Sequence, residues 1–348
     1  MAGAIGAVSI AIAGYTARHS PESVDASLLS TSAGGSGGVV ESMRPLMGTQ
    51  FAVKIWAPPG REPAAAEAIR AALDGVAELE RHISSWLPDS DTAKVGRAAG
   101  RSAVRVGVEL RELLAVSTRW ARRTGGAFDV TAGPLFELWD AAREQGLLPS
   151  EDAVQEGLAR VGYDRIELRD ETVRLPVAGM KLGFGSVGKG FAADRVAAQL
   201  RAAGFANFII DAGGDLVLSG SRGGTPWHIG VRHPRSVQLL ATARLTGCAI
   251  ATSGDYEQYL VADGVRYGHI IDPRTGWPAR EVASVVVVAP RGADADALAT
   301  GLFVLGPEEG LALVEKITSV EALFVMNDGD LRRSTGLSLQ GEILERIE

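Results

Sequence analysis

Cysteine is almost absent from this chain of 348 residues, in which Cys248 is the only thiol. A single cysteine excludes an intramolecular disulfide and a thiolate metal cluster, because each of these needs a partner cysteine. Cys248 stands in the apolar run Gly-Cys-Ala-Ile over 247–250, which is typical of a core position rather than of a catalytic thiol.

Basic charge is also scarce. The chain holds 35 Lys and Arg against 42 Asp and Glu, which gives a formal net charge of -7. Proteins that bind nucleic acid through its phosphates need clustered Lys and Arg, so we expect no nucleic-acid partner. The charge balance favours a small ligand or a protein partner. Since 46% of the residues are hydrophobic and 22% are charged, the chain can build one large core or two ordinary ones.

The N-terminus lacks an apolar run long enough to span a bilayer, which takes about 20 residues. The apolar stretch over 2–14 has the length of a signal-peptide hydrophobic region, but no basic segment precedes it. A Ser/Gly-rich tract over 30–38 predicts a flexible linker. We therefore predict a signal-like segment and linker over 1–41 and a folded domain over 42–348. We also expect an exported protein, or a membrane-associated one that faces outside the cytoplasm and is held there through its N-terminus.

The apolar pattern of the body predicts helices and strands in mixed order. Apolar positions at three- and four-residue steps predict helices, and short apolar runs bounded by turn residues predict strands. The predicted helices are 64–87, 109–124, 191–203 and 295–305. The predicted strands are 49–56, 208–210, 227–231, 239–245, 256–261, 282–289 and 322–326, with a hairpin over 165–175. Runs of strands with helices grouped between them predict an α+β fold.

A glycine-rich loop over 183–190, Gly-Phe-Gly-Ser-Val-Gly-Lys-Gly, precedes the predicted helix at 191–203. Such loops present backbone N–H groups to phosphates, so they are typical of pyrophosphate sites. The residues alone leave three interpretations open. The loop fits a Rossmann G-x-G-x-x-G with Asp211 as the ribose partner, and it fits a P-loop except that Gly190 replaces the magnesium-binding hydroxyl. In the third interpretation, its glycines simply allow a helix and a strand to approach closely.

Six groups of motifs follow one another along the chain. They are LMGT at 46–49, SSW at 84–86 with PDS at 88–90, TGGAFD at 124–129, the glycine loop running into FAADR at 191–195, DAGGD at 211–215, and finally TSGDY at 252–256 with HIIDPRTG at 269–276 and DADALAT at 294–300. With these motifs the chain resembles the ApbE family of FAD:protein FMN transferases from Pro45 to about Gly306. A Rossmann dehydrogenase has no use for them.

The resemblance implies a two-lobed α+β fold, in which mixed and antiparallel sheets are flanked by helices and FAD lies in a cleft between the lobes. It implies that the isoalloxazine lies near Met47 and Trp86 and that Lys189 lies beside the pyrophosphate. The full set of FAD-binding residues that it implies is Met47, Trp86, Ala127, Phe128, Asp129, Gly183, Lys189 and Ile271.

Asp296 and Thr300 are four residues apart on the predicted helix, so their side chains share one face. Carboxylate and hydroxyl oxygens are hard ligands that suit magnesium rather than zinc or copper. The resemblance implies a Mg²⁺ site formed by Ser186, Asp296, Ala299 and Thr300, with Ser186 acting through its backbone carbonyl. An Asp near a helix start can instead be an N-cap, for which Asp294 is the better candidate.

His269 is one of five histidines and precedes Asp272 and Pro273. It can act as a general base, because its ordinary pKa of about 6.5 suits proton transfer near neutral pH. It can equally serve as a hydrogen-bonding residue of the turn over 272–276. We assign His269 and Lys189 to catalysis.

The expected function is magnesium-dependent transfer of FMN from FAD to a Ser or Thr hydroxyl of an acceptor flavoprotein, with release of AMP. Two positions depart from the family's pattern, because Gly183 stands where Asp is usual and Trp86 stands where Tyr is usual. Trp can still stack on a flavin, whereas the missing carboxylate weakens the case for activity. The alternatives are an FAD-binding protein without transfer activity, an FAD pyrophosphatase, and a Rossmann oxidoreductase.

Overall fold

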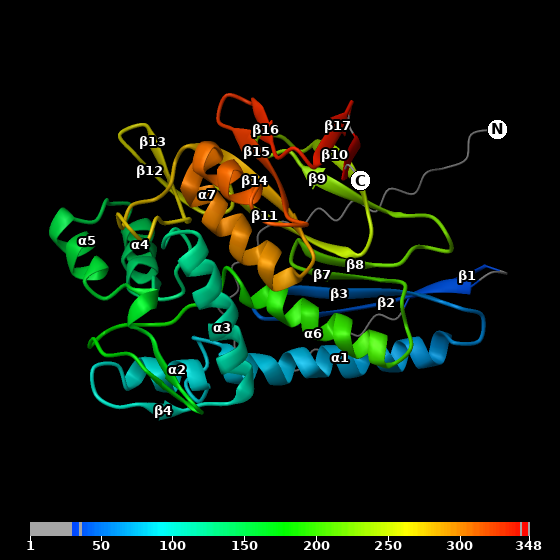
Figure 1. Cartoon of the computed structure of the whole chain (residues 1–348), viewed down its shortest axis with the longest axis horizontal. Coiled ribbons are helices and arrows are strands. Elements are labelled where there is room, and N and C mark those ends of the chain that lie inside the picture. The colour runs from blue at the N-terminus through cyan, green and yellow to red at the C-terminus, as the bar shows by residue number, and fades with distance from the viewer. Residues whose placement is uncertain (1–29, 35–36, 342, 347–348) are drawn as a thin grey trace.

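The structure is a computed structural model that describes residues 30–34, 37–341 and 343–346 (Figure 1). The signal-like stretch over 2–14 lies outside these residues. The predicted linker is corrected in part, because strand β1 (Ser30–Gly34) pairs with strand β2 (Gly37–Leu46). The described fold therefore extends N-terminal to the predicted start at Ser42. The β-branched Val40 explains part of this, since its side chain is fully buried in the main core.

A nine-stranded sheet forms the centre of the molecule, in the order β1-β2-β3-β7-β8-β11-β14-β15-β16. Every neighbouring pair is antiparallel. The remaining strands are β3 (Thr49–Ala57), β7 (Phe208–Ala212), β8 (Asp215–Ser219), β11 (Cys248–Gly254), β14 (Val282–Ala289), β15 (Glu321–Met326) and β16 (Leu331–Arg333). A Rossmann fold needs parallel strands joined by crossover helices, so the Rossmann interpretation of the glycine loop is wrong.

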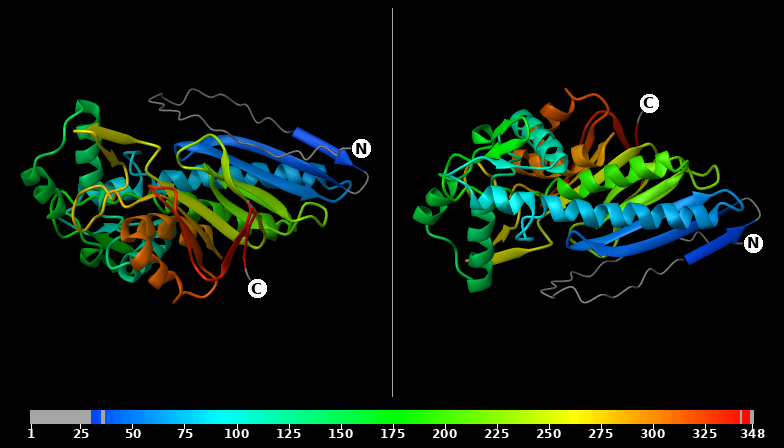
Figure 2. Two further views of the ribbon diagram at one scale, coloured as in Figure 1. Left: turned by 90° about the horizontal axis from the view of Figure 1, so that it is seen from above. Right: turned by 90° about the horizontal axis from the view of Figure 1, so that it is seen from below.

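Three long helices cover one face of this sheet (Figures 1 and 2). They are α1 (Glu62–Ile83), α6 (Gly188–Ala202) and α7 (Gly292–Val314). The periodic apolar stripe of α1 meets β2, β3 and α6, while α7 packs on β11, β14 and α6. Among the described residues α7 alone is long and apolar enough to cross a membrane, and 61% of its most apolar window is buried within the protein, as in a core helix.

A second sheet covers the opposite face, and it explains why β14 is a continuous valine-rich run. This sheet has the order β17-β18-β10-β9, with β17 (Leu337–Gln340), β18 (Ile343–Arg346), β10 (Leu239–Leu245) and β9 (Trp227–Arg232). Val285 and Val287 of β14 belong to the helix-side core, and Val286 and Val288 belong to the core against the second sheet. A strand covered on both faces needs no alternation of apolar and polar residues.

The remaining elements gather at one end of the molecule, at the left of Figure 1. They are α2 (Asp91–Arg97), α3 (Val108–Arg123), α4 (Gly133–Gln145), α5 (Glu151–Leu158), the sheet β4-β6-β5 (Val104–Arg105, Thr172–Arg174 and Glu167–Arg169) and the hairpin β12-β13 (Tyr259–Ala262 and Val265–Gly268). A separate apolar cluster that includes Leu135, Trp139, Leu260 and Ile271 joins α4 to the segment after β13. The fold is α+β, as predicted.

Candidate functional site

The glycine loop leads directly into α6, which begins at Gly188, three residues before the predicted helix. Gly188 N donates to Phe184 O at 2.7 Å, and Gly183 N donates to Val130 O at 2.7 Å. A side chain added at Gly183 or Gly185 would meet nothing within 4 Å. The N-cap residue of α6, Val187, makes no side-chain cap bond, and within the first turn Gly190 N donates to the side chain of Asp296. The loop therefore leaves open space beside a helix N-terminus, as a phosphate site requires.

Gly190 has a different role, because the first turns of α6 and α7 touch there. A Cβ on Gly190 would lie 2.8 Å from Ala293 N and closer still to the carbonyl of Gly292. No residue larger than glycine fits this backbone contact. This explains why the hydroxyl residue of a P-loop is missing here. The close approach is between two helices, α6 and α7, and not between a helix and a strand as the close-packing interpretation expected.

The N-terminus of α7 is capped from a distant part of the chain. Asp194 of α6 accepts hydrogen bonds from Gly292 N at 2.7 Å and from Ala293 N at 3.1 Å. The prediction that Asp294 caps this helix is wrong, because the N-cap is Arg291 and makes no side-chain cap bond. Asp294 instead accepts a hydrogen bond from Trp120 Nε1 at 2.7 Å and pairs with Arg119. Asp296 is therefore not the cap of α7.

A charged cluster forms where α6, α7 and β8 meet, in which the Asp215 and Asp296 side chains are 11% and 6% exposed and that of Lys189 is 25% exposed. Lys189 Nζ lies 2.6 Å from Asp215 Oδ2 and 3.6 Å from Asp296 Oδ1. Burial alone would lower the pKa of Lys189, but the carboxylates of Asp215 and Asp296 outweigh it and raise the pKa above its ordinary value. Lys189 therefore stays protonated at neutral pH. Asp215 belongs to the DAGGD motif but was not predicted as a site residue. A charged residue at the start of an apolar strand is the signal that could have found it.

Asp296 joins the glycine loop to α7. Its Oδ2 atom accepts a hydrogen bond from Gly190 N at 3.0 Å, and its side chain is almost fully buried. Burial, with the nearby Asp215 charge, raises the pKa of Asp296 to about 7 against the opposing effect of Lys189. A carboxylate in this position gains strongly from an added positive charge.

Thr300 lies one turn further along α7 and faces β11, where its Oγ1 atom is 3.3 Å from Ser253 Oγ. Ala299 is buried and offers only backbone oxygen. The Gly185 carbonyl links the glycine loop to the cluster, since it accepts a hydrogen bond from Lys189 Nζ at 3.4 Å. Among the described residues, no hydrogen bond joins Ser186 to Asp296. The donors gathered here are oxygens, and in the described part of the chain His, Cys, Asp and Glu form no metal-binding group of three or more.

Two of the predicted flavin contacts lie near the open loop or at the surface. Met47 has a left-handed backbone, with φ of 52°, its N donates to Glu80 Oε2 at 3.0 Å, and its Cε would lie 3.4 Å from a Cβ on Gly188. Trp86, in the loop after α1, is 87% exposed. An indole this exposed has a free face on which an aromatic ring can stack.

Four further predicted flavin contacts, Ala127, Phe128, Asp129 and Ile271, are buried. Ala127 and Phe128 belong to the main core, and Ile271 belongs to the cluster around Trp139. The Asp129 carboxylate accepts hydrogen bonds from Thr131 N at 2.7 Å and Tyr163 N at 2.9 Å, while burial raises its pKa. These side chains hold their segments in shape, so contact between a ligand and Ala127, Phe128 or Ile271 falls to backbone atoms.

His269 follows β13, and its Nδ1 atom is buried without a hydrogen-bond partner among the described residues. Burial, followed by the charge of Arg143, lowers the pKa of His269 below its ordinary value. The imidazole is therefore neutral at pH 7 and able to accept a proton. The turn over 272–276 is closed by Asp272, whose carbonyl accepts from Gly276 N at 2.8 Å and whose Oδ1 accepts from Arg274 N at 2.8 Å.

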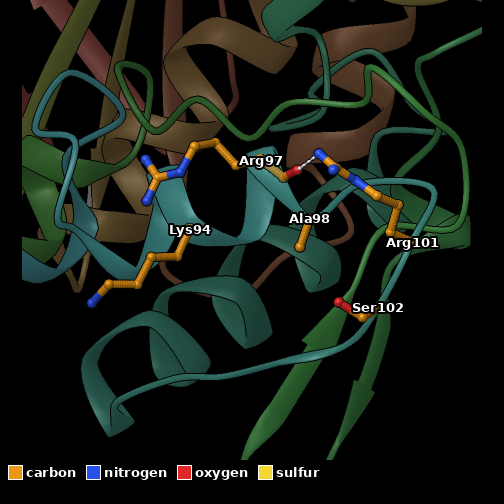
Figure 3. Close-up of a pocket in the computed structure, with 5 residues that line it drawn as sticks. All are labelled: Lys94, Arg97, Ala98, Arg101 and Ser102. Atoms are coloured by element: carbon orange, nitrogen blue, oxygen red, sulfur yellow. Dashed lines mark hydrogen bonds between the residues drawn. The ribbon is translucent and has the colours of Figure 1, made fainter.

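A shallow pocket of about 390 Å³ beside α2 is not part of this site (Figure 3). Its lining is Lys94, Arg97, Ala98, Arg101 and Ser102. Figure 3 shows Lys94 and Arg97 pointing to one side and Arg101 to the other, where it donates to the Arg97 carbonyl. Its cations do not converge on a common point, and it shares no residue with the cluster around Lys189.

Comparison with known proteins places this arrangement in one family. Residues 47–324 match the ApbE family. The chain is 35% identical over 325 residues to the FAD:protein FMN transferase of Treponema pallidum, covering 86% of this chain and 88% of the relative. It is 30% identical over 274 residues to the protein of the same name in Escherichia coli K12, covering 76% and 77% of the two chains.

Two solved structures share the fold along most of the chain. The ApbE protein of Thermotoga maritima superposes with a TM-score of 0.77 at 32% identity, covering 85% of this chain and 97% of that one. The flavin transferase ApbE of Vibrio cholerae superposes with a TM-score of 0.76 at 30% identity, with the same coverage of 85% and 97%.

Proposed function

This chain belongs to the ApbE family, and on that premise we propose that it is a transferase that moves FMN from FAD to an acceptor protein. The name of its relatives, FAD:protein FMN transferase, supports this activity. The observation that carries it is the protonated Lys189, held between Asp215 and Asp296 at the start of α6. It provides a fixed cation beside an open glycine loop, and a pyrophosphate needs both the cation and the backbone N–H donors.

In the proposed reaction, a Ser or Thr hydroxyl of the acceptor attacks the FMN phosphorus of FAD. The hydroxyl oxygen bonds to that phosphorus, the bond from phosphorus to the bridging oxygen breaks, and AMP leaves with the bridging oxygen. The hydroxyl proton passes to His269, which is neutral because burial lowers its pKa. Lys189 binds the pyrophosphate, exchanging a carboxylate partner for phosphate oxygens.

We place the flavin ring between the exposed Trp86 indole and Met47, which lies between β2 and β3 and whose Cε atom is close to Gly188 at the start of α6. The pyrophosphate then follows the loop from Gly183 toward Lys189. The backbone of 127–129 and of Ile271 completes the FAD site in this proposal. The open space beside Gly183 and Gly185 supports the placement, because a ligand can approach the backbone closely there.

The oxygen donors at the start of α7 fit magnesium. The Asp296 carboxylate and the Thr300 hydroxyl would hold the ion, together with backbone oxygens of Ser186 and Ala299. The attraction of this position for a cation is supported by the pairing of Lys189 with Asp296 and Asp215. When bound, Mg²⁺ supplies charge neutralisation for the pyrophosphate and the departing AMP.

Chelation is expected to stop transfer reversibly. With excess EDTA, FMN transfer falls to background, because Lys189 is then the remaining cation beside the pyrophosphate and the charge of Mg²⁺ is lost. Added Mg²⁺ restores the rate, while added Ca²⁺ restores less, since it favours longer bonds and higher coordination numbers. Initial rates of flavin incorporation measure this. A rate that saturating EDTA leaves unchanged would show that the metal assignment is wrong.

The proposed function is tested by incubating the purified protein with FAD, Mg²⁺ and a flavin-acceptor protein. Flavin fluorescence that survives denaturation of the acceptor, together with one AMP per flavin attached, supports the transferase. AMP without protein-bound flavin supports an FAD pyrophosphatase instead. FAD binding without either product supports a flavin-binding protein that does not transfer.

Gly183 is the observation that favours this last alternative, because the resemblance leads us to expect Asp there. A side chain at this position meets no atom within 4 Å, and Gly183 N remains bonded to Val130 O. The variant Gly183→Asp is therefore expected to fold normally and to raise transfer several-fold at limiting Mg²⁺, since it adds a carboxylate near the cation. Rates measured across a Mg²⁺ titration, with Gly183→Asn as the uncharged control, check this. Equal rates for both variants would show that a negative charge at position 183 does not increase transfer.

We also propose that the protein is exported or membrane-associated, with its N-terminal residues as the signal or anchor. The apolar stretch over 2–14 supports this. Fractionation of cells that produce the full chain, compared with cells that produce residues 30–348, tests the proposal. Equal amounts of both proteins in the cytoplasmic fraction would contradict it.

A further inference from the structure

A second pocket, of about 430 Å³, is lined in part by the residue before His269 and shares no residue with the cluster around Lys189. We call it the arginine pocket. Its lining residues are Arg235, Asp255, Val265, Arg266, Gly268, Ala279, Arg280 and Asn327. Gly268 immediately precedes His269, and consecutive Cα atoms lie only about 3.8 Å apart. The pocket therefore lies close to the backbone of the residue that we propose as the base, although the His269 side chain is not part of its lining.

The charges of this pocket are unevenly compensated. Arg235 is neutralised by Asp255, with Nη2 donating to Oδ2 at 2.8 Å, and Nη2 also donates to Asn327 Oδ1 at 3.0 Å. Neither Arg266 nor Arg280 has a carboxylate partner within the described part of the chain. Two positive charges are thus left for an incoming group, in a protein whose formal net charge is -7.

Aromatic rings hold these two guanidinium groups in place. Arg266 Cζ lies 4.2 Å from the centre of the Tyr259 ring, and Arg280 Cζ lies 5.4 Å from the centre of the Tyr267 ring. Tyr267 in turn stacks on the buried Trp139. Stacking fixes the position of a guanidinium while its N–H edges remain able to bind carboxylates.

The surroundings favour a protein ligand over a small anion. Tyr259 and Val261 of strand β12 are 45% and 56% exposed, next to Arg266 on β13. The β12-β13 hairpin projects from the end of the molecule in Figure 1. Exposed Tyr and Arg beside an apolar side chain are typical of protein interfaces.

We propose that the arginine pocket docks an acidic segment of the acceptor protein, so that the neighbouring Ser or Thr reaches His269. This rests on the proposed function and adds the chemistry of the partner: carboxylates of the acceptor pair with Arg266 and Arg280, and its apolar residues contact Tyr259 and Val261.

The test measures binding rather than transfer. Two fluorescent peptides of equal length carry a central Thr, one flanked by Asp and Glu and the other by Lys and Arg, and their binding to the full-length protein is followed by anisotropy. We expect the acidic peptide to bind at least about tenfold more tightly and to weaken as salt rises, as charge pairing requires. Equal binding of the two peptides would overturn the proposal.

Variants locate the binding site. Arg266→Glu/Arg280→Glu is expected to weaken acidic-peptide binding by about tenfold or more and to leave the FAD Kd unchanged. Arg266→Gln/Arg280→Gln gives a smaller loss and shows that the effect is not only new repulsion. The matched control, Arg122→Glu/Arg169→Glu, changes the net charge equally on other exposed surfaces and should bind like the wild type.

The remaining outcomes separate the two proposals. An equal loss in the control would mean that only net charge matters, and a changed FAD Kd would assign the pocket to FAD; either result overturns docking. A protein that binds the acidic peptide through Arg266 and Arg280 but never transfers FMN would support docking and contradict the proposed function. A protein that transfers FMN but shows no preference between the peptides would support the proposed function and contradict docking.

Discussion

Replacing Asp296 by alanine is expected to abolish FMN transfer while leaving the protein folded. The carboxylate is the charged oxygen donor in the proposed metal site, so its loss removes the cation from beside the pyrophosphate. Metal-ion stabilisation of developing charge is worth several kcal/mol, which corresponds to a fall in kcat of about 1,000-fold or more.

The fold is expected to tolerate this change. Burial raises the pKa of the Asp296 carboxyl to about 7, so the structure gains little from its ionised form. Lys189 keeps Asp215 as a partner at 2.6 Å. The conservative variant Asp296→Asn preserves shape and removes charge, and it should be as inactive as the alanine variant. Initial rates of transfer with Mg²⁺ measure the loss of activity, and thermal unfolding in EDTA measures the change in stability. An Asn variant with wild-type kcat would exclude Asp296 as the metal ligand.

Replacing Gly190 by alanine is expected to destabilise the protein by about 3 kcal/mol or more, as overpacked cores do. The added Cβ would lie 2.8 Å from Ala293 N and closer to the Gly292 carbonyl, and neither is a flexible side chain. The two helices must therefore move apart. That movement also stretches the bond from Gly190 N to Asp296 Oδ2, so transfer should fall with stability.

Gly185→Ala is the matched control for this substitution. It lies in the same loop, and its Cβ would meet nothing within 4 Å. We expect its free energy of unfolding to stay within about 0.5 kcal/mol of the wild type, the usual range for a surface substitution. Denaturant unfolding measures both variants. If the two alanine variants lose equal stability, the contact between the helices is not what requires glycine at position 190.

The long elements could be predicted from sequence because their apolar pattern is local. Helix α3 (Val108–Arg123) and strand β10 (Leu239–Leu245) were found to within about one residue because their periodicity is clear. Strand β11 (Cys248–Gly254) was missed, since Ala, Thr, Ser and Gly give a weak strand signal. The β12 strand begins at Tyr259 rather than at 256. The order of the nine strands depends on pairing between distant segments, which no local pattern reveals.

The site could also be predicted in part, where its residues lie close together in the sequence. Asp296 and Thr300 could be paired because both lie on one helix, where spacing fixes the shared face. The cap of α7 could not be found, because Asp194 is 98 residues away from Gly292 in the chain. The pairing of Lys189 with Asp215 likewise arises only when β8 meets the start of α6. Contacts that cross elements needed the folded structure.

Intact-mass analysis of an acceptor protein after incubation with this protein, FAD and Mg²⁺ tests the central claim most directly. We predict that the acceptor gains the mass of one FMN less one water, that the gain maps to a Ser or Thr, and that it is absent with Asp296→Ala. An acceptor of unchanged mass, under conditions in which an established FAD:protein FMN transferase labels it fully, would contradict the proposal that this chain is a flavin transferase.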